Sequence, residues 1–96
     1  MNNSRRKEIE KLKSKLEDVI MDATSEIEDI KGQLDEIKDE EQESFDALPD
    51  SLQCSERGEA MENAITNLEE ADSLLDDLIS NLDSDDICSS LDEAIV

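Results

Sequence analysis

The fold is decided by residues 61–82, which read MENAITNLEEADSLLDDLISNL. Apolar residues recur there at alternating spacings of three and four, at Met61, Ala64, Leu68, Ala71, Leu75, Leu78 and Leu82. This spacing places an apolar stripe along one side of an α-helix. Ile65, Leu74 and Ile79 widen the stripe on one side. We therefore predict a helix over residues 55–82.

A second and longer apolar stripe precedes this segment. It runs through Ile9, Leu12, Leu16, Val19, Ile20, Ala23, Ile27, Ile30, Leu34 and Ile37, with a coiled-coil-like stutter at Val19 and Ile20. No proline interrupts it, and Asn3 or Ser4 is placed to cap its start. The pattern predicts a helix over residues 4–44, roughly 60 Å long at ~1.5 Å per residue.

The two stripes are joined by a turn over residues 45–54. Pro49 disfavours helical geometry at the preceding residue. Asp50, with Gln53 three residues later, is placed to cap a short turn, and Ser55 to cap the second helix. Folding the chain about Pro49 pairs positions whose numbers sum to about 98, such as Ile27 with Ala71. We predict an all-α, coiled-coil-like antiparallel helical hairpin in one domain over residues 1–96. Residues 83–96 form either a short helix or a frayed, acidic tail.

The charge of the chain is large and uneven. It has 29 acidic and 9 basic residues, a net charge of −20. Residues 1–15 sum to +4 and residues 16–96 to −24. The hairpin is expected to bring the basic segment 5–15 beside the acids of the second arm, namely Asp76, Asp77, Asp83, Asp85 and Asp86. Each exposed ion pair is worth only ~0–1 kcal/mol, so these pairs set orientation more than stability.

A hairpin of two helices has a thin core. Each buried Leu or Ile contributes about 1.5–3 kcal/mol, whereas ordering costs near ~1.5 kcal/mol per residue. The widened side of the second stripe, at Ile65, Leu74 and Ile79, has no obvious partner within the hairpin. We therefore predict a homodimer with a four-helix arrangement. The packing residues are Ile65, Leu68, Leu74, Leu75, Leu78 and Ile79.

The residue types needed for most catalysis are missing. The chain has no histidine, no glycine-rich phosphate loop and no Cys-x-x-Cys pair. Asp83-Ser84-Asp85-Asp86 begins like a calcium loop, but its sixth and twelfth positions are Cys88 and Ala94 instead of Gly and Glu. We predict no enzymatic activity, no cofactor and no metal site. The sequence lacks an apolar run of ~18 residues, so we expect no membrane association. Its two cysteines show no disulfide pattern, which fits a reducing cytoplasm.

The acidic surface is the candidate for function. Residues 16–96 would carry about one net charge per 2.5 Å of a ~60 Å rod, and duplex DNA carries one per ~1.7 Å. Solubility alone needs a net charge of only ~2–8. We expect crowding to raise the pKa of some carboxyls, with greater helicity near pH 5 than near pH 8. The candidate partner-binding residues are Asp35, Glu36, Asp39, Glu40, Glu43, Glu56, Glu59, Glu62, Glu69 and Glu70.

Residues 48–62, which read LPDSLQCSERGEAME, resemble a recurring stretch in small acidic helical proteins of phages and mobile elements. The resemblance covers the turn and the start of the second helix. It implies an accessory protein that counters a host defence, in the cytoplasm of a bacterial host, and it transfers no site residues.

Two functions remain open. One is an inhibitor that mimics DNA and occupies the basic, nucleic-acid-binding groove of a host nuclease, CRISPR effector or other DNA-binding protein, without binding nucleic acid itself. The alternative is a structural or assembly coiled coil that recruits a partner helix through its apolar stripe.

Overall fold

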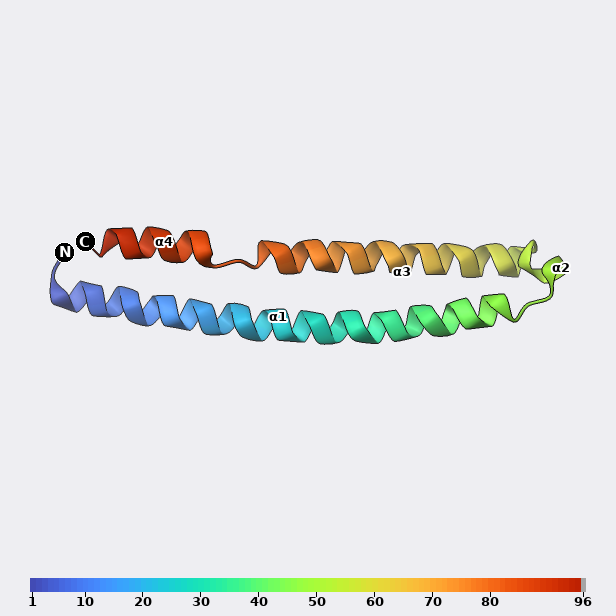
Figure 1. The fold of residues 1–96 in the computed structure, drawn as a ribbon, viewed down its shortest axis with the longest axis horizontal. Helices are drawn as coiled ribbons and strands as arrows, with labels where there is room; N and C mark the ends of the chain where they lie inside the picture. Colours follow the sequence, from blue (N-terminus) through green and yellow to red (C-terminus); the bar gives the residue numbers. More distant parts are fainter. Residues whose placement is uncertain (96) are drawn as a thin grey trace.

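The computed structural model describes residues 1–95 and is an extended helical hairpin of 74 × 16 × 13 Å. Its helices are α1 (Asn3–Asp46), α2 (Asp50–Gln53), α3 (Glu56–Asn81) and α4 (Asp85–Ala94). α1 forms one arm, and α3 followed by α4 forms the antiparallel arm (Figure 1). The start of α1 and the end of α4 lie at the same end of the hairpin, and α2 lies at the opposite end. The predicted all-α hairpin is confirmed, and residues 85–94 form a helix and not a frayed tail.

The long helices begin at polar side chains that satisfy their first free N–H groups. The Asn2 side chain accepts a hydrogen bond from the Arg5 N–H at 2.8 Å, so α1 is capped just before the predicted Asn3 or Ser4. Ser55 caps α3 as predicted, and its Oγ accepts from the Gly58 N–H at 3.4 Å. Between α3 and α4, Asp83 Oδ1 accepts from the Asp85 N–H at 2.9 Å.

The turn is organised by Gln53 and Gly58. The Gln53 side-chain amide donates to the carbonyls of Phe45 and Leu48, both at 3.2 Å, and so satisfies one acceptor in the last turn of α1 and one in the loop after it. Gly58 is buried, and a Cβ added there would lie 2.1 Å from the Gln53 carbonyl oxygen. The predicted cap of Asp50 with Gln53 is wrong, because α2 has no side-chain cap and Gln53 serves α1 instead.

The register of the hairpin differs from the prediction by about one heptad. Lys13 Nζ lies 2.8 Å from Asp92 Oδ1, and Lys31 Nζ lies 3.4 Å from Asp72 Oδ1. These positions sum to 105 and 103, whereas folding about Pro49 predicted 98. The centre of the turn is shifted because α1 continues to Asp46 and the short helix α2 follows the proline. The predicted pairing of Ile27 with Ala71 is therefore wrong.

The shifted register also changes the partners of the basic segment. Within residues 5–15, Lys13 pairs with Asp92 of α4. Asp76, which was expected beside that segment, instead lies 3.3 Å from Lys31.

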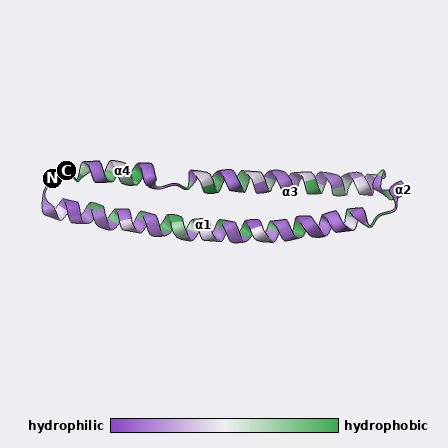
Figure 2. Ribbon diagram, viewed as in Figure 1, coloured by the Kyte–Doolittle hydropathy of each residue, from purple (hydrophilic) through white to green (hydrophobic). Residues whose placement is uncertain are grey.

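Little of the molecule is buried. Hydrophobic residues occur along the whole length of both arms and are interleaved with hydrophilic ones (Figure 2). Among the described residues, Ile65 and Cys88 are the only buried apolar side chains, at 7% and 9% exposure. α1 is also rotated relative to the predicted stripe. Its lysines at 13 and 31 lie at the interface, where each reaches a carboxylate of the other arm. Part of the apolar arc of α1 is consequently left outside.

Candidate functional site

The hairpin has two broad faces of different chemistry. Each helix has a line of half-buried residues that face the other arm. An antiparallel pair of helices is related by an approximate two-fold axis perpendicular to the plane of the hairpin. Rotation about this axis exchanges the two arms but does not exchange the two broad faces. Consecutive side chains of a helix are rotated by about 100° around its axis. Residues just before an inward-facing position therefore point to one broad face in both arms, and residues just after it point to the other.

The first face carries large apolar side chains, and Glu8, Asp22 and Glu26 also come one residue before an inward-facing position. Each of its large side chains comes one residue before a half-buried or buried residue. On α1 the spacings are seven, eleven and seven residues, which keep these side chains in line because both intervals are close to whole helical turns. Their exposure lies between 45% and 62%. We call this set the apolar face: Leu12, Val19, Ile30, Ile37, Leu74, Leu78 and Ile87.

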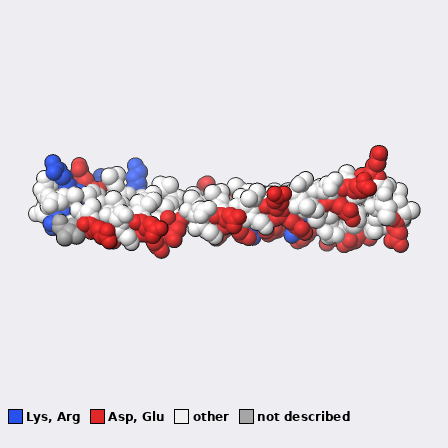
Figure 3. Space-filling view, turned by 90° about the horizontal axis from the view of Figure 1, so that it is seen from above, with Lys and Arg blue, Asp and Glu red and all other residues white. Residues whose placement is uncertain are grey.

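The second face is acidic, and its residues come one position after an inward-facing residue. We call this set the acid face: Glu10, Glu17, Glu28, Asp35, Asp39, Glu43, Asp46, Glu62, Glu69, Asp76 and Asp92. Among the described residues at such helical positions, Met21 is the one exposed large apolar side chain. Two shallow grooves place residues of both arms together on this face: one involves Glu10, Glu17 and Asp92, the other Glu62 and Glu69 with Gln42. Figure 3 shows acidic side chains gathered along one long edge of the upper arm, with far fewer along the opposite edge.

The structure divides the predicted acidic residues between this face and the outer edges. Asp35, Asp39, Glu43, Glu62 and Glu69 belong to the acid face. Four others lie nearly opposite the centre of the inward-facing line of their helix, namely Glu36, Glu40, Glu59 and Glu70. Glu36 and Glu59 are among them although they follow Asp35 and Gly58, because Asp35 lies at the edge of that line and Gly58 is buried against α2. Glu56 begins α3 beside the turn. The prediction missed the acid-face residues toward the chain ends, including Glu17, Asp76 and Asp92. The position after each inward-facing residue is the sequence signal that would have found them.

The predicted packing residues divide in the same way. Ile65 is buried, and Leu68, Leu75 and Ile79 are half-buried toward α1. Ile65 and Ile79 were expected to lack a partner within the hairpin, and the structure gives them one. Leu74 and Leu78 remain 60% and 45% exposed on the apolar face.

Charges within the interface are concentrated around Lys31. Its Nζ lies 3.3 Å from Asp76 and 3.4 Å from Asp72. Hydrogen bonding to Asp76 is the main cause that raises the pKa of Lys31, followed among the raising causes by the charge of Asp72. Desolvation raises the pKa of the Asp35 carboxyl, and the hydrogen bond and charge of Asp72 raise it further. Burial is thus the larger cause at Asp35 and the neighbouring carboxylate of Asp72 the smaller one, whereas the crowding argument considered only the neighbouring charges.

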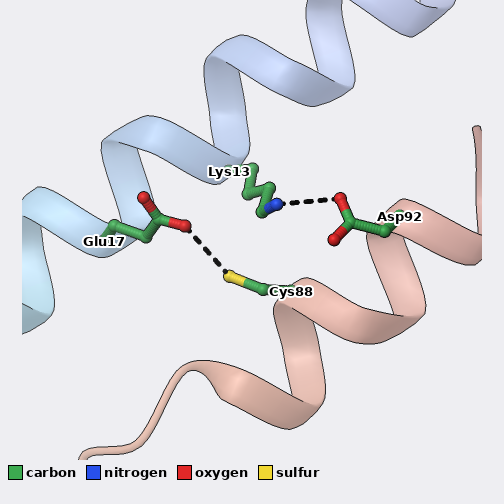
Figure 4. Close-up of polar contacts among 4 residues, drawn as sticks. All are labelled: Lys13, Glu17, Cys88 and Asp92. Carbon is green, nitrogen blue, oxygen red and sulfur yellow. Dashed lines mark hydrogen bonds and ion pairs between the residues drawn. The ribbon is translucent and has the colours of Figure 1, made fainter.

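Two polar contacts connect α4 to α1 (Figure 4). Lys13 Nζ donates to Asp92 Oδ1 at 2.8 Å, and Cys88 Sγ donates to Glu17 Oε1 at 3.5 Å. Burial is the main cause that raises the pKa of the Cys88 thiol, so this cysteine is held protonated and packed. Cys54 is free and exposed at the opposite end, beside the turn. The two cysteines thus lie near opposite ends of the hairpin, with Cys88 packed and Cys54 exposed.

The described residues contain no group of three or more His, Cys, Asp or Glu arranged to hold a metal ion. None of their helices is both long enough and apolar enough to cross a membrane.

Comparisons with family models, with curated proteins and with solved structures found no match to this chain. The fold therefore defines its class by geometry alone: a long antiparallel helical hairpin with one apolar and one acidic broad face. The resemblance of residues 48–62 to phage and mobile-element proteins stays a prediction.

Proposed function

We propose that this chain is a non-enzymatic binding protein whose acid face occupies a basic, nucleic-acid-binding surface of another protein. The observation that supports this is the segregation of carboxylates. A protein that used acid only for solubility would gain as much from charges spread around both faces. Here eleven carboxylates follow the inward-facing positions of three helices over nearly the full length of the rod.

The spacing of charge supports a nucleic-acid-like surface. Dividing the 74 Å length by 20 net charges gives about 3.7 Å per charge, close to the ~3.4 Å per charge of one DNA strand. This replaces the spacing of about 2.5 Å expected from the sequence, because the structure is longer than ~60 Å and all 96 residues share its length. A rigid rod with this spacing presents carboxylates where a basic groove expects phosphates.

The partner is therefore a protein with a groove rich in lysine and arginine. A host nuclease, a CRISPR effector or another DNA-binding protein has such a groove, and the resemblance of residues 48–62 favours a phage or mobile-element inhibitor of this kind. Nucleic acid itself is repelled by a chain with a net charge of −20. Binding should weaken steeply with salt, as expected for contacts between exposed charges.

The test uses two variants with the same change in net charge. Glu62→Lys with Glu69→Lys reverses two charges on the acid face. Glu59→Lys with Glu70→Lys reverses two charges of the same helix at its outer edge. The wild-type chain is used to capture its partner from a bacterial lysate, and each variant is then measured for affinity and for displacement of DNA from that partner.

The acid-face variant should lose about tenfold or more in affinity, and the outer-edge variant should lose much less. Wild-type chain should also displace DNA from the partner. Equal losses in the two variants would contradict the role of the acid face. Binding that leaves the partner's DNA affinity unchanged would contradict DNA mimicry.

The exposed apolar face favours a second candidate function, an assembly module that recruits a helix of another protein. In that case Leu74→Asp should abolish binding of the captured partner, and the acid-face charge reversals should leave it unchanged. Leu74 is the suitable position because Leu75 faces α1 and its replacement would also disturb the hairpin.

A further inference from the structure

We propose that the apolar face is the contact surface of a homodimer, in which two copies pack face to face and antiparallel, with their turns at opposite ends. The inference goes beyond the proposed function and does not depend on it. It rests on three properties of the hairpin: the lack of a core in one copy, the symmetry of the apolar face, and the distribution of charge along the rod.

One copy leaves most of its large apolar side chains in contact with water. Ile65 and Cys88 are the only buried apolar side chains among the described residues, whereas the seven side chains of the apolar face are 45–62% exposed. Large exposed apolar side chains aligned along one face of a protein mark an interaction site. A second hairpin of the same length covers the face along the whole rod and leaves both acid faces in solvent.

The apolar-face residues of α1 are spaced symmetrically about the midpoint of the helix. The intervals between Leu12, Val19, Ile30 and Ile37 are seven, eleven and seven residues. Their midpoint coincides with the midpoint of α1, which spans Asn3–Asp46. A two-fold axis at that midpoint, across the rod, places α1 over α1 of the second copy. Leu12 then lies level with Ile37 of the second copy, and Val19 with its Ile30.

The same two-fold axis also brings apolar residues of the other arm level with one another. Because Lys13 lies beside Asp92, the midpoint of α1 is level with residues 80 and 81 of the other arm. The axis therefore places Leu74 level with Ile87 of the second copy. Six of the seven residues of the apolar face thus meet large apolar residues across the interface, and Leu78 lies level with Asp83 of the second copy.

The distribution of charge selects the antiparallel arrangement. Residues 35–70, which surround the turn, hold thirteen acidic and two basic residues. Residues 1–20 and 83–96, at the other end of the hairpin, hold nine acidic and six basic residues. A parallel dimer would bring the two strongly acidic turn ends together. The antiparallel dimer separates them by the length of the rod, which is many times the Debye length of ~8 Å at physiological salt.

The first experiment measures mass and its dependence on the apolar face. Sedimentation equilibrium of the full chain at tens of micromolar should give twice the chain mass of 10.8 kDa. Ile30→Asp with Leu74→Asp should raise the dissociation constant by about 100-fold or more, because unpaired carboxylates would be buried. The matched control, Ser25→Asp with Ser73→Asp, adds the same charge on the opposite face and should change it less than about threefold. A monomeric wild-type chain would overturn the proposal and would assign the face to another protein. So would a dimer that tolerates the apolar-face substitutions.

The second experiment measures orientation without disturbing the interface. Cys54 is exposed near the turn, so a spin label on Cys54 in a Cys88→Ser chain reports the distance between the two turns. The antiparallel dimer should give a distance approaching the 74 Å length of the hairpin. Parallel copies packed ~10 Å apart would place the labels within about 30 Å of each other. A short distance would overturn the antiparallel arrangement even if the Asp variants fail to fold.

Discussion

Replacing either glycine by alanine tests the turn, because the two positions have opposite surroundings. A Cβ at Gly58 would lie 2.1 Å from the Gln53 carbonyl oxygen and 2.6 Å from that of Leu52. These carbonyl oxygens belong to the backbone and cannot rotate away from the new Cβ as a flexible side chain could, so α2 has to move. Movement of α2 would also disturb the two hydrogen bonds from the Gln53 amide to Phe45 and Leu48. At Gly32, by contrast, a Cβ meets nothing within 4 Å.

The magnitude follows from these contacts. Overpacking costs about 1–3 kcal/mol, and each disturbed hydrogen bond costs about 0.5–1.5 kcal/mol. The gain in helix propensity offsets about 1 kcal/mol of this. Gly58→Ala should therefore lower the free energy of unfolding by about 1–5 kcal/mol. Gly32→Ala should raise it by about 1 kcal/mol, since only the propensity gain remains.

The assay is thermal and urea unfolding followed by circular dichroism, with all chains at one concentration. A change of 1 kcal/mol corresponds to about 4–8 °C in Tm for a domain of this size. Gly32→Ala is the control, because it measures the gain in helix propensity on replacing glycine by alanine without a steric clash. A Gly58→Ala chain that is as stable as wild type, with Gly32→Ala stabilised as expected, would refute the close approach of α2 and α3.

Three further predictions concern charge and assembly. The raised pKa of Asp35 means that the folded state favours its neutral form, so this group should make the protein more stable as pH falls from neutral toward the ordinary pKa of 3.8. Asp35→Asn should raise Tm at pH 7 and reduce this pH dependence, and a lower Tm at pH 7 would contradict the cause assigned to the shift. Lys31→Met removes the ion pairs with Asp72 and Asp76 and should lower Tm at 50 mM salt, with a smaller loss at 1 M salt because salt screens the wild-type pairs. Because the raised pKa of Lys31 lies above 10.5, its wild-type contribution should persist below that pH and disappear as pH rises through the folded value, which a Tm series from pH 8 to 11 measures. A dimer should show a Tm that rises with protein concentration, and a constant Tm from 1 to 100 μM would argue against association.

The arms of the hairpin could be predicted because they depend on local patterns. Apolar residues at three- and four-residue spacing, few glycines and a single proline predict two long helices that pack along their apolar stripes. The predicted ends of these helices, at residues 4, 44, 55 and 82, lie within two residues of those of α1 and α3. Ser55 was identified as a cap for the same reason, since a cap requires only residues three positions away.

The register and the turn could not be predicted in the same way. A slip of one heptad preserves an apolar stripe, so the stripes alone do not distinguish a sum of 98 from one of 105. The choice depends on α2, on the Gln53 amide and on the close packing at Gly58, which are contacts between residues that no single-helix pattern relates. Gln53 and Gly58 both lie in the segment of residues 48–62, outside the two apolar stripes.

The sequence by itself determined two long amphipathic helices, their antiparallel return and a large acidic surplus, because helix periodicity and net charge are properties of neighbouring residues and of composition. Only the tertiary structure decided which part of each apolar arc is covered. Lys13 and Lys31 reach carboxylates of the other arm, so α1 is turned toward them and Leu12 and Ile30 are left outside. This rotation, set by interactions between the arms, divides the surface into an apolar face and an acid face.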